Sequence, residues 1–100
     1  MVWPLIWAPA AIANLAEIKT FLDIKSVTAS ERIVSEILEK VSLLISQPYL
    51  GWIYRDLPRS PVRETVQGNY RIFYSILELE SSIEIMRIWH TSQLEPKSLK

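Results

Sequence analysis

Cysteine is absent from the chain, and this absence removes several classes of protein at once. Without thiols there is no disulfide framework, no thiolate zinc site and no cysteine nucleophile. The absence of disulfides agrees with a reducing cytoplasm, where we expect the protein to reside. Stability must then come from packing, and we expect neither a metal nor a cofactor.

The chain also lacks a net charge, because eleven Lys and Arg balance eleven Asp and Glu. A protein that binds nucleic acid mainly through electrostatics needs a basic excess, so any polyanion site must be local. The one candidate region is residues 51–75, which holds Arg55, Arg59, Arg63 and Arg71 against only Asp56 and Glu64.

No apolar run approaches the ~20 residues that a membrane-spanning helix requires, so we expect a soluble protein with no membrane partner. The apolar residues 1–16 have no basic residue ahead of them and are interrupted by Pro4 and Pro9, which argues against a secretory signal. One hundred residues with 49% apolar composition suffice for one core between two layers of secondary structure. We expect a single domain over residues 1–92 and a short polar tail over residues 93–100.

Two segments have the spacing of amphipathic helices. The first follows a short apolar strand at residues 2–7 and runs from Pro9 to about Ile24. The second begins at residues 28–31, which have the form of a capping box, and ends before Pro48. Because only a few residues join the two helices, they should form an antiparallel hairpin.

Beyond the helices the apolar period changes to that of strands. The strand-like segments are residues 62–66, 70–79 and 83–90, separated by turn residues at 67–69 and 80–82. Residues 49–61 carry Gly51, Pro58 and Pro61, which indicates an irregular connection.

The predicted fold is therefore α+β in the order β-α-α-β-β-β. An antiparallel helical hairpin should pack on one face of a small, mostly antiparallel sheet and leave the other face partly open for a site. The expected core consists of Leu15, Ile18, Leu22, Ile37, Val41 and Leu44 from the helices and Ile72, Tyr74 and Ile85 from the sheet.

Residues 63–74 have the sequence RETVQGNYRIFY and lie across the predicted turn. This segment resembles the pattern of the RelE/ParE toxin superfamily, and Trp7-Ala8, residues 48–51 and residues 85–90 extend the match to about residues 3–92. The resemblance implies the toxin of a type II toxin–antitoxin module of the plasmid-stabilisation type. It further implies growth inhibition, neutralised by an antitoxin encoded beside the toxin.

Two mechanisms occur among the proteins that this chain resembles. RelE-like members cut messenger RNA in the ribosomal A site, whereas ParE-like members poison DNA gyrase and lack that nuclease chemistry. In the nuclease branch, an arginine at the position of Arg71 contacts phosphate. Strand alternation places the side chain of Arg71 on the sheet face away from Ile72 and Tyr74. Arg71 could equally pair with Glu64 or Glu84.

The chain offers few other groups for cutting RNA. Val62 and Glu64 stand where the nuclease branch would offer lysines, and residues 91–93 are Thr-Ser-Gln where an Arg or a His and Tyr pair is common. His90 is the only histidine and so the obvious candidate for proton transfer, but a lone histidine at a strand end is more often structural. The catalytic candidates, if the chain is a nuclease, are Arg71 and His90.

Partner contacts have a separate set of candidates. Arg63 and Arg87 could extend a basic patch with Arg71 or be cross-strand partners of Glu84 and Glu64. Most aromatic residues belong in the core, but Trp52 and Tyr54 lie beside Arg55 in the irregular segment. The candidates for target or partner binding are Trp52, Tyr54, Arg55, Arg63, Arg71 and Arg87.

These observations favour a ParE-like toxin that binds a protein target such as DNA gyrase and is held inactive by a cognate antitoxin. The alternative is a RelE-like, ribosome-dependent endoribonuclease whose targets are the ribosome and its message. A third possibility is a non-toxic relic that only binds an antitoxin. In each case we expect an antitoxin tail to cover the apolar surface left between the helices and the sheet edge.

Overall fold

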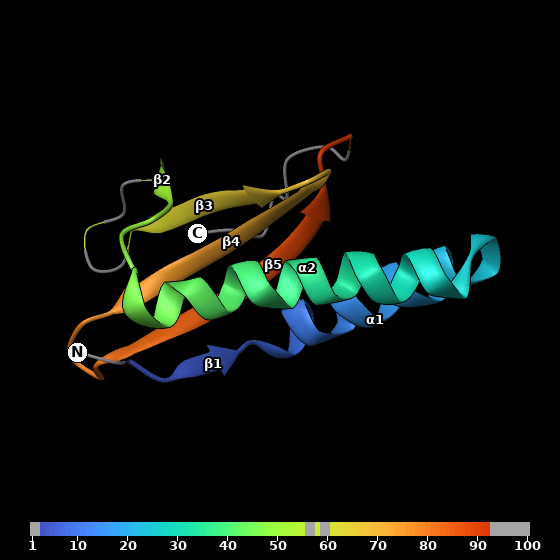
Figure 1. Cartoon of the computed structure of the whole chain (residues 1–100). Helices are drawn as coiled ribbons and strands as arrows, with labels where there is room; N and C mark the ends of the chain where they lie inside the picture. Colours follow the sequence, from blue (N-terminus) through green and yellow to red (C-terminus); the bar gives the residue numbers. More distant parts are fainter. Residues whose placement is uncertain (1–2, 56–57, 59–60, 93–100) are drawn as a thin grey trace.

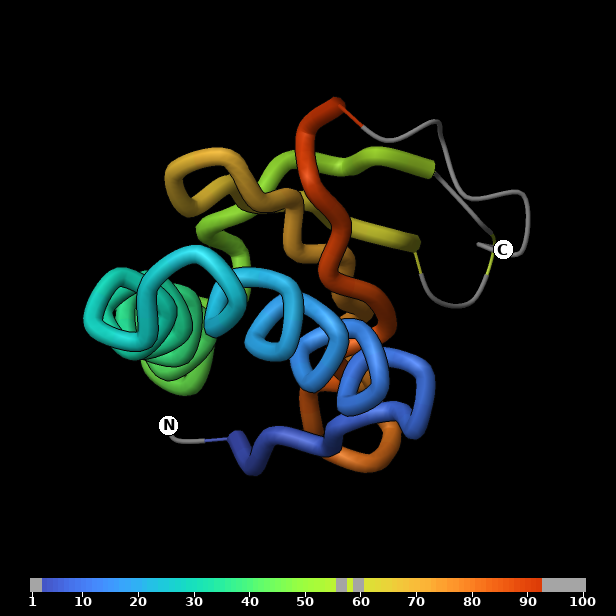
Figure 2. Tube along the Cα trace, turned by 90° about the vertical axis from the view of Figure 1, so that its right-hand side faces the viewer, coloured from blue at the N-terminus to red at the C-terminus, as the bar shows by residue number. Residues whose placement is uncertain are grey.

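The computed structural model describes residues 3–55, 58 and 61–92 of the chain. Its elements are β1 (Leu5–Trp7), α1 (Pro9–Lys25), α2 (Val27–Ser46), β2 (Trp52–Arg55), β3 (Val62–Gln67), β4 (Tyr70–Leu77) and β5 (Ser82–His90). The two helices lie side by side on one face of a five-stranded sheet (Figures 1 and 2). The predicted α+β architecture is confirmed.

The sheet has the strand order β1-β5-β4-β3-β2. β1 pairs with β5 in parallel, and the remaining pairs are antiparallel. β4 is therefore the central strand, and β1 and β2 form the two edges. Because β4 and β3 are joined by the tight turn around Gly68, whose φ is +58°, residues 63–67 lie directly opposite residues 70–74.

The prediction of an irregular connection over residues 49–61 was wrong in part. Residues 52–55 form the edge strand β2, in which Trp52 lies opposite Glu64 and Ile53 lies opposite Arg63. The pairing shifts between Ile53 and Arg55, so the strand lacks a regular alternation. A four-residue strand with such a shift, next to Gly51, gives no period that the sequence could reveal.

The boundary between the helices also differs from the prediction. Ser26 is the N-cap of α2, and its hydroxyl accepts a hydrogen bond from the amide of Ala29 at 3.2 Å. Thr28 therefore lies inside the first turn, and the predicted capping box is wrong. The same Ser26 ends α1 by donating its amide to the carbonyl of Leu22, so a single residue turns the chain between the helices.

β4 ends two residues earlier than predicted, at Leu77. Residues 78–81 form the turn into β5, and Ser81 adopts a φ of +50°. Leu79, which the apolar pattern placed in the strand, is fully exposed at 100%. Because residues 78–81 form the turn, Leu79 lies outside the strand despite its preference for strands.

The main core lies between α2 and the sheet. Ile37, Val41 and Leu44 are buried against the sheet residues Ile72, Tyr74 and Ile85, as predicted. From α1, Leu15 and Ile18 pack against this cluster and stay half-buried. Leu22 lies outside the cluster and lines a cavity at the closed end of the hairpin, where Ser26 joins the two helices. This end of the hairpin extends beyond the strands in Figure 1.

Candidate functional site

The sheet face away from the helices carries a second, smaller hydrophobic cluster. Val62 and Phe73 are completely buried there, with Tyr54, Met86 and Trp89 packed against them. The ring of Tyr54 meets that of Phe73 edge-on, with the centroids 5.0 Å apart. This cluster fills part of the face that was predicted to stay partly open, and the polar groups of that face lie around the cluster.

Arg71 lies on this face and is held by Glu64. Its Nε donates to one carboxylate oxygen at 2.6 Å and its Nη2 donates to the other at 3.4 Å. The guanidinium also lies 4.9 Å from the ring centroid of Phe73. The hydrogen bond that Arg71 donates to Glu64 raises the pKa of Arg71 above its ordinary value, against the opposing effect of burial. Of the two pairings considered for Arg71, the structure forms the one with Glu64.

His90 lies on the other face of the sheet. It is opposite Tyr70, whose ring it meets edge-on at 5.3 Å, whereas Arg71 is opposite Trp89. The register of β4 and β5 shifts between Phe73, opposite Arg87, and Tyr74, opposite Ile85, which leaves Met86 as an extra residue. Such a bulge inverts the alternation of side chains beyond it.

The bulge decides which groups share a face. Without the bulge, strict alternation from the buried Ile85 would place His90 on the face away from the helices, which is the face of Arg71. With the bulge, Ile88 lies in the core and His90 lies on the same, helix-facing side of the sheet. There, Nδ1 of His90 accepts a hydrogen bond from the amide of Ser92 at 3.1 Å. The two catalytic candidates are thus not brought together.

The predicted basic patch is likewise divided between the two faces. Arg63 lies opposite Tyr74 on the helix side, where its Nη1 donates to the carbonyl of Gly51 at 2.7 Å. Arg87 lies opposite Phe73 on the face of Arg71 and donates to the carbonyl of Met86 at 2.8 Å. Arg63 serves to hold the turn after α2, a role that charge counting could not reveal.

The aromatic candidates on β2 differ in their surroundings. Tyr54 belongs to the second cluster, and the guanidinium of Arg55 lies 5.7 Å from its ring. Trp52 is 54% exposed and Ile53 is about as exposed, both on an edge strand. Trp52 is therefore the aromatic candidate that presents a large apolar surface to solvent.

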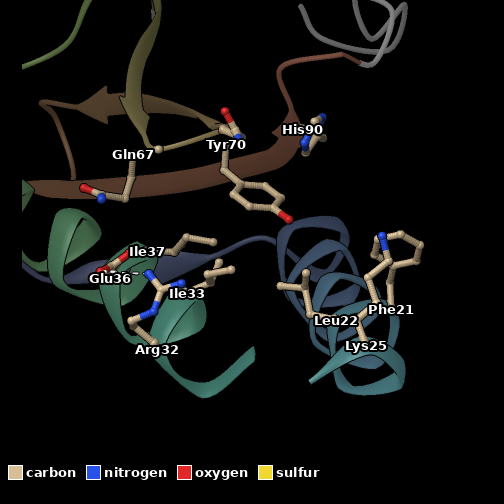
Figure 3. Close-up of a pocket in the computed structure, with 12 residues that line it drawn as sticks. Phe21, Leu22, Lys25, Arg32, Ile33, Glu36, Ile37, Gln67, Tyr70 and His90 are labelled. Atoms are coloured by element: carbon tan, nitrogen blue, oxygen red, sulfur yellow. Dashed lines mark hydrogen bonds and ion pairs between the residues drawn. The ribbon is translucent and has the colours of Figure 1, made fainter. Parts of the chain in front are cut away.

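A cavity that the sequence did not predict lies under the closed end of the hairpin (Figure 3). Tyr70, Ile33 and Leu22 contribute to its walls. Within the described ranges, no three His, Asp or Glu side chains gather in a way that could hold a metal ion. Neither α1 nor α2, the helices of the part that the structure describes, combines the length and apolarity needed to cross a membrane.

Comparison with known proteins gives one family and a shared fold. The family model described as the ParE toxin of a type II toxin–antitoxin system, parDE, matches residues 5–95. No curated protein matches the chain in sequence.

Several solved structures are similar to this chain, and three of them are toxin–antitoxin systems. The archaeal RelE–RelB complex from Pyrococcus horikoshii OT3 has a TM-score of 0.71 at 13% identity and covers 94% of this chain and 100% of its own. The chromosomal ParDE system from P. aeruginosa has a TM-score of 0.73 at 17% identity, with 91% and 98% covered. The RelBE2 complex from Mycobacterium tuberculosis has a TM-score of 0.65 at 18% identity, with 93% and 95% covered. At these identities the likeness shows the fold alone, and RelE and ParE proteins share it.

Proposed function

Because the chain belongs to the ParE toxin family of type II toxin–antitoxin systems, we propose that it is a cytoplasmic toxin of the ParE-like branch. It inhibits growth by binding a protein target, DNA gyrase, and a cognate antitoxin holds it inactive. The observation that carries the choice of branch is the ion pair between Arg71 and Glu64, because it occupies the charge that a nuclease would direct at phosphate.

Separating the ion pair costs considerable free energy. The side chains of Arg71 and Glu64 are only 20% and 7% exposed. A phosphate that displaced Glu64 would leave a carboxylate buried without its counter-charge, which costs several kcal/mol in proteins, on the order of 3 to 5. Glu64 therefore competes with any RNA phosphate for Arg71, and this competition favours a toxin that does not cut RNA.

The only histidine of the chain cannot support proton transfer on the face of Arg71. Cleavage through the 2′-hydroxyl requires a base, an acid and charge at the phosphate, and each acid or base contributes roughly 10²- to 10⁴-fold. His90 lies on the opposite face of the sheet. A substrate phosphate held at Arg71 would therefore be out of reach of the one histidine.

We expect the purified toxin to inhibit gyrase supercoiling and to leave ribosome-bound message intact. The decisive assay adds the toxin to purified ribosomes programmed with a defined message and maps cuts by primer extension, with gyrase supercoiling measured in parallel. Arg71→Ala and His90→Ala serve as variants. Clear A-site cuts that Arg71→Ala abolishes would instead establish the RelE-like endoribonuclease. If the protein does not cut message, does not inhibit gyrase and does not slow growth, it is the relic that only binds an antitoxin.

Among the predicted contact residues, Trp52 is the one that we propose for the gyrase contact. A large exposed aromatic residue on an edge strand is typical of residues that dominate binding energy. Trp52→Ala should weaken gyrase inhibition by about 10-fold or more, which corresponds to about 1.4 kcal/mol. Leu79→Ala is the matched control, because Leu79 is equally apolar, fully exposed and placed in the β4–β5 turn. Equal inhibition by both variants would remove Trp52 from the interface.

The antitoxin is proposed to cover the apolar surface of the hairpin. α1 presents apolar side chains away from the sheet as well as toward it, and Ile12, Phe21 and Ile24 are all exposed. An exposed apolar surface of this kind marks an interaction site, and a disordered antitoxin tail that folds on binding would cover it.

Co-expression with the product of the adjacent reading frame should yield a stable complex. In that complex, amide hydrogen exchange should slow in α1 relative to the free toxin, because a bound segment excludes water and suppresses local opening. Two proteins that purify separately, or a complex that leaves exchange in α1 unchanged, would contradict the proposed coverage.

A further inference from the structure

The cavity under the closed end of the hairpin, here called the hairpin pocket, has a volume of 370 Å³. It opens where α1 and α2 pass the turn between β3 and β4, and Leu22, Ile33 and Ile37 line it with apolar surface (Figure 3). A neighbouring cavity of 340 Å³ shares Phe21, Tyr70 and His90 with it, so these three side chains line both cavities. This size lies within the range of sites that hold a small ligand or a partner side chain.

Tyr70 places a polar group in this apolar pocket. The residue is only 9% exposed, and its side chain points away from the sheet toward α1 (Figure 3). Within the described part of the chain, its hydroxyl forms no hydrogen bond, and it is not among the fully buried unpaired atoms, so water reaches it. Burial raises the pKa of Tyr70, so the hydroxyl stays protonated and can donate. An occupant that excludes water from this hydroxyl must therefore supply an acceptor for it, because a donor buried without one is unfavourable.

The charged groups at the pocket rim also favour an acceptor. The ammonium of Lys25 lies 4.7 Å from the ring centroid of Phe21 and has no carboxylate at ion-pair distance among the described residues. Arg32 has Glu36 as its partner at 3.5 Å, so that carboxylate is already in use. The rim therefore carries one positive charge more than these neighbours balance. Glu17 lines only the adjoining cavity.

We propose that the hairpin pocket receives an apolar side chain and an adjacent carboxylate from an acidic segment of the antitoxin. The apolar part lies on Leu22, Ile33 and Ile37, and the carboxylate accepts from the Tyr70 hydroxyl and pairs with Lys25. The assignment of this segment to the antitoxin rests on the proposed function. The chemistry of the pocket stands on its own residues and can be tested without an antitoxin.

The first test titrates isotope-labelled, full-length toxin with 3-phenylpropionate, which carries a ring and a carboxylate, and follows amide chemical shifts. Saturable shifts should centre on Lys25, Ile33 and Tyr70, and the neutral 3-phenylpropionamide should bind at least about 5-fold more weakly. Tyr70→Phe, which removes only the hydroxyl, should weaken the acid about 10-fold, as expected for a hydrogen bond to a charged group. Tyr49→Phe is the matched control, because its hydroxyl bonds to Glu78 outside the pocket.

Equal binding of acid and amide, shifts centred elsewhere, no saturable shift, or no effect of Tyr70→Phe would each overturn the pocket chemistry. The second test repeats the titration on the complex with the co-expressed antitoxin. Loss of the pocket shifts supports the antitoxin as the occupant, and unchanged binding of the acid overturns that assignment. If no complex forms, the proposed antitoxin partner fails together with this occupant, while the first test still decides the pocket chemistry.

Discussion

Replacing Glu64 with alanine is expected to lower the free energy of unfolding by about 3 kcal/mol. The change leaves the guanidinium of Arg71 in a half-buried site, beside Phe73, without its counter-charge. The value lies at the low end for a broken buried pair, because 20% of the Arg71 side chain still reaches water. Urea denaturation followed by tryptophan fluorescence measures the loss.

Two further variants separate charge from packing. Glu64→Met combined with Arg71→Met should be much closer to the wild type than either single change, since an apolar pair of similar volume avoids the cost of desolvating two charges. Lys19→Ala breaks the exposed pair with Asp23 and should cost less than about 1 kcal/mol. If Glu64→Ala costs no more stability than Lys19→Ala, then Glu64 does not hold Arg71, and the guanidinium is available to bind a phosphate.

Gly51→Ala is expected to destabilise the fold by about 3 kcal/mol. An added Cβ would lie 2.6 Å from the carbonyl oxygen of Glu64 and 2.8 Å from the hydroxyl of Tyr74. Neither atom can retreat easily. The first belongs to the strand backbone, and the second accepts from the Gly51 amide and donates to the carbonyl of Pro48, both at 2.8 Å. The substitution therefore disturbs the contact that attaches the turn after α2 to the central strand.

The other glycine of the chain provides the matched control. Gly68 has a φ of +58° and nothing within 4 Å of an added Cβ, so Gly68→Ala should cost only the backbone strain of about 1 kcal/mol. Gly68→Asn should recover part of that cost, because asparagine tolerates this conformation. Chemical denaturation of the three variants gives the comparison. A smaller loss for Gly51→Ala than for Gly68→Ala would mean that the turn after α2 shifts to make room.

The sequence by itself determined the layers of this protein. The spacing of Ile37, Val41 and Leu44 defined the buried face of α2, and the alternation around Ile72 and Tyr74 defined that of β4. These signals are local, because a helix or a strand repeats its buried positions within a few residues. The segment around residues 63–74 likewise indicated the superfamily, which the family match over residues 5–95 confirmed.

Only the tertiary structure decided which polar residues meet. Arg71 had two acidic candidates, and the register set by the tight turn between β3 and β4 selected Glu64. The extra residue Met86 in β5 moved His90 to the face opposite Arg71, an outcome that strict alternation contradicts. Pairing register and bulges arise from the fit between strands that are distant in the chain. A sequence pattern can therefore identify the candidate residues of this site, and the assembled sheet decides which of them act together.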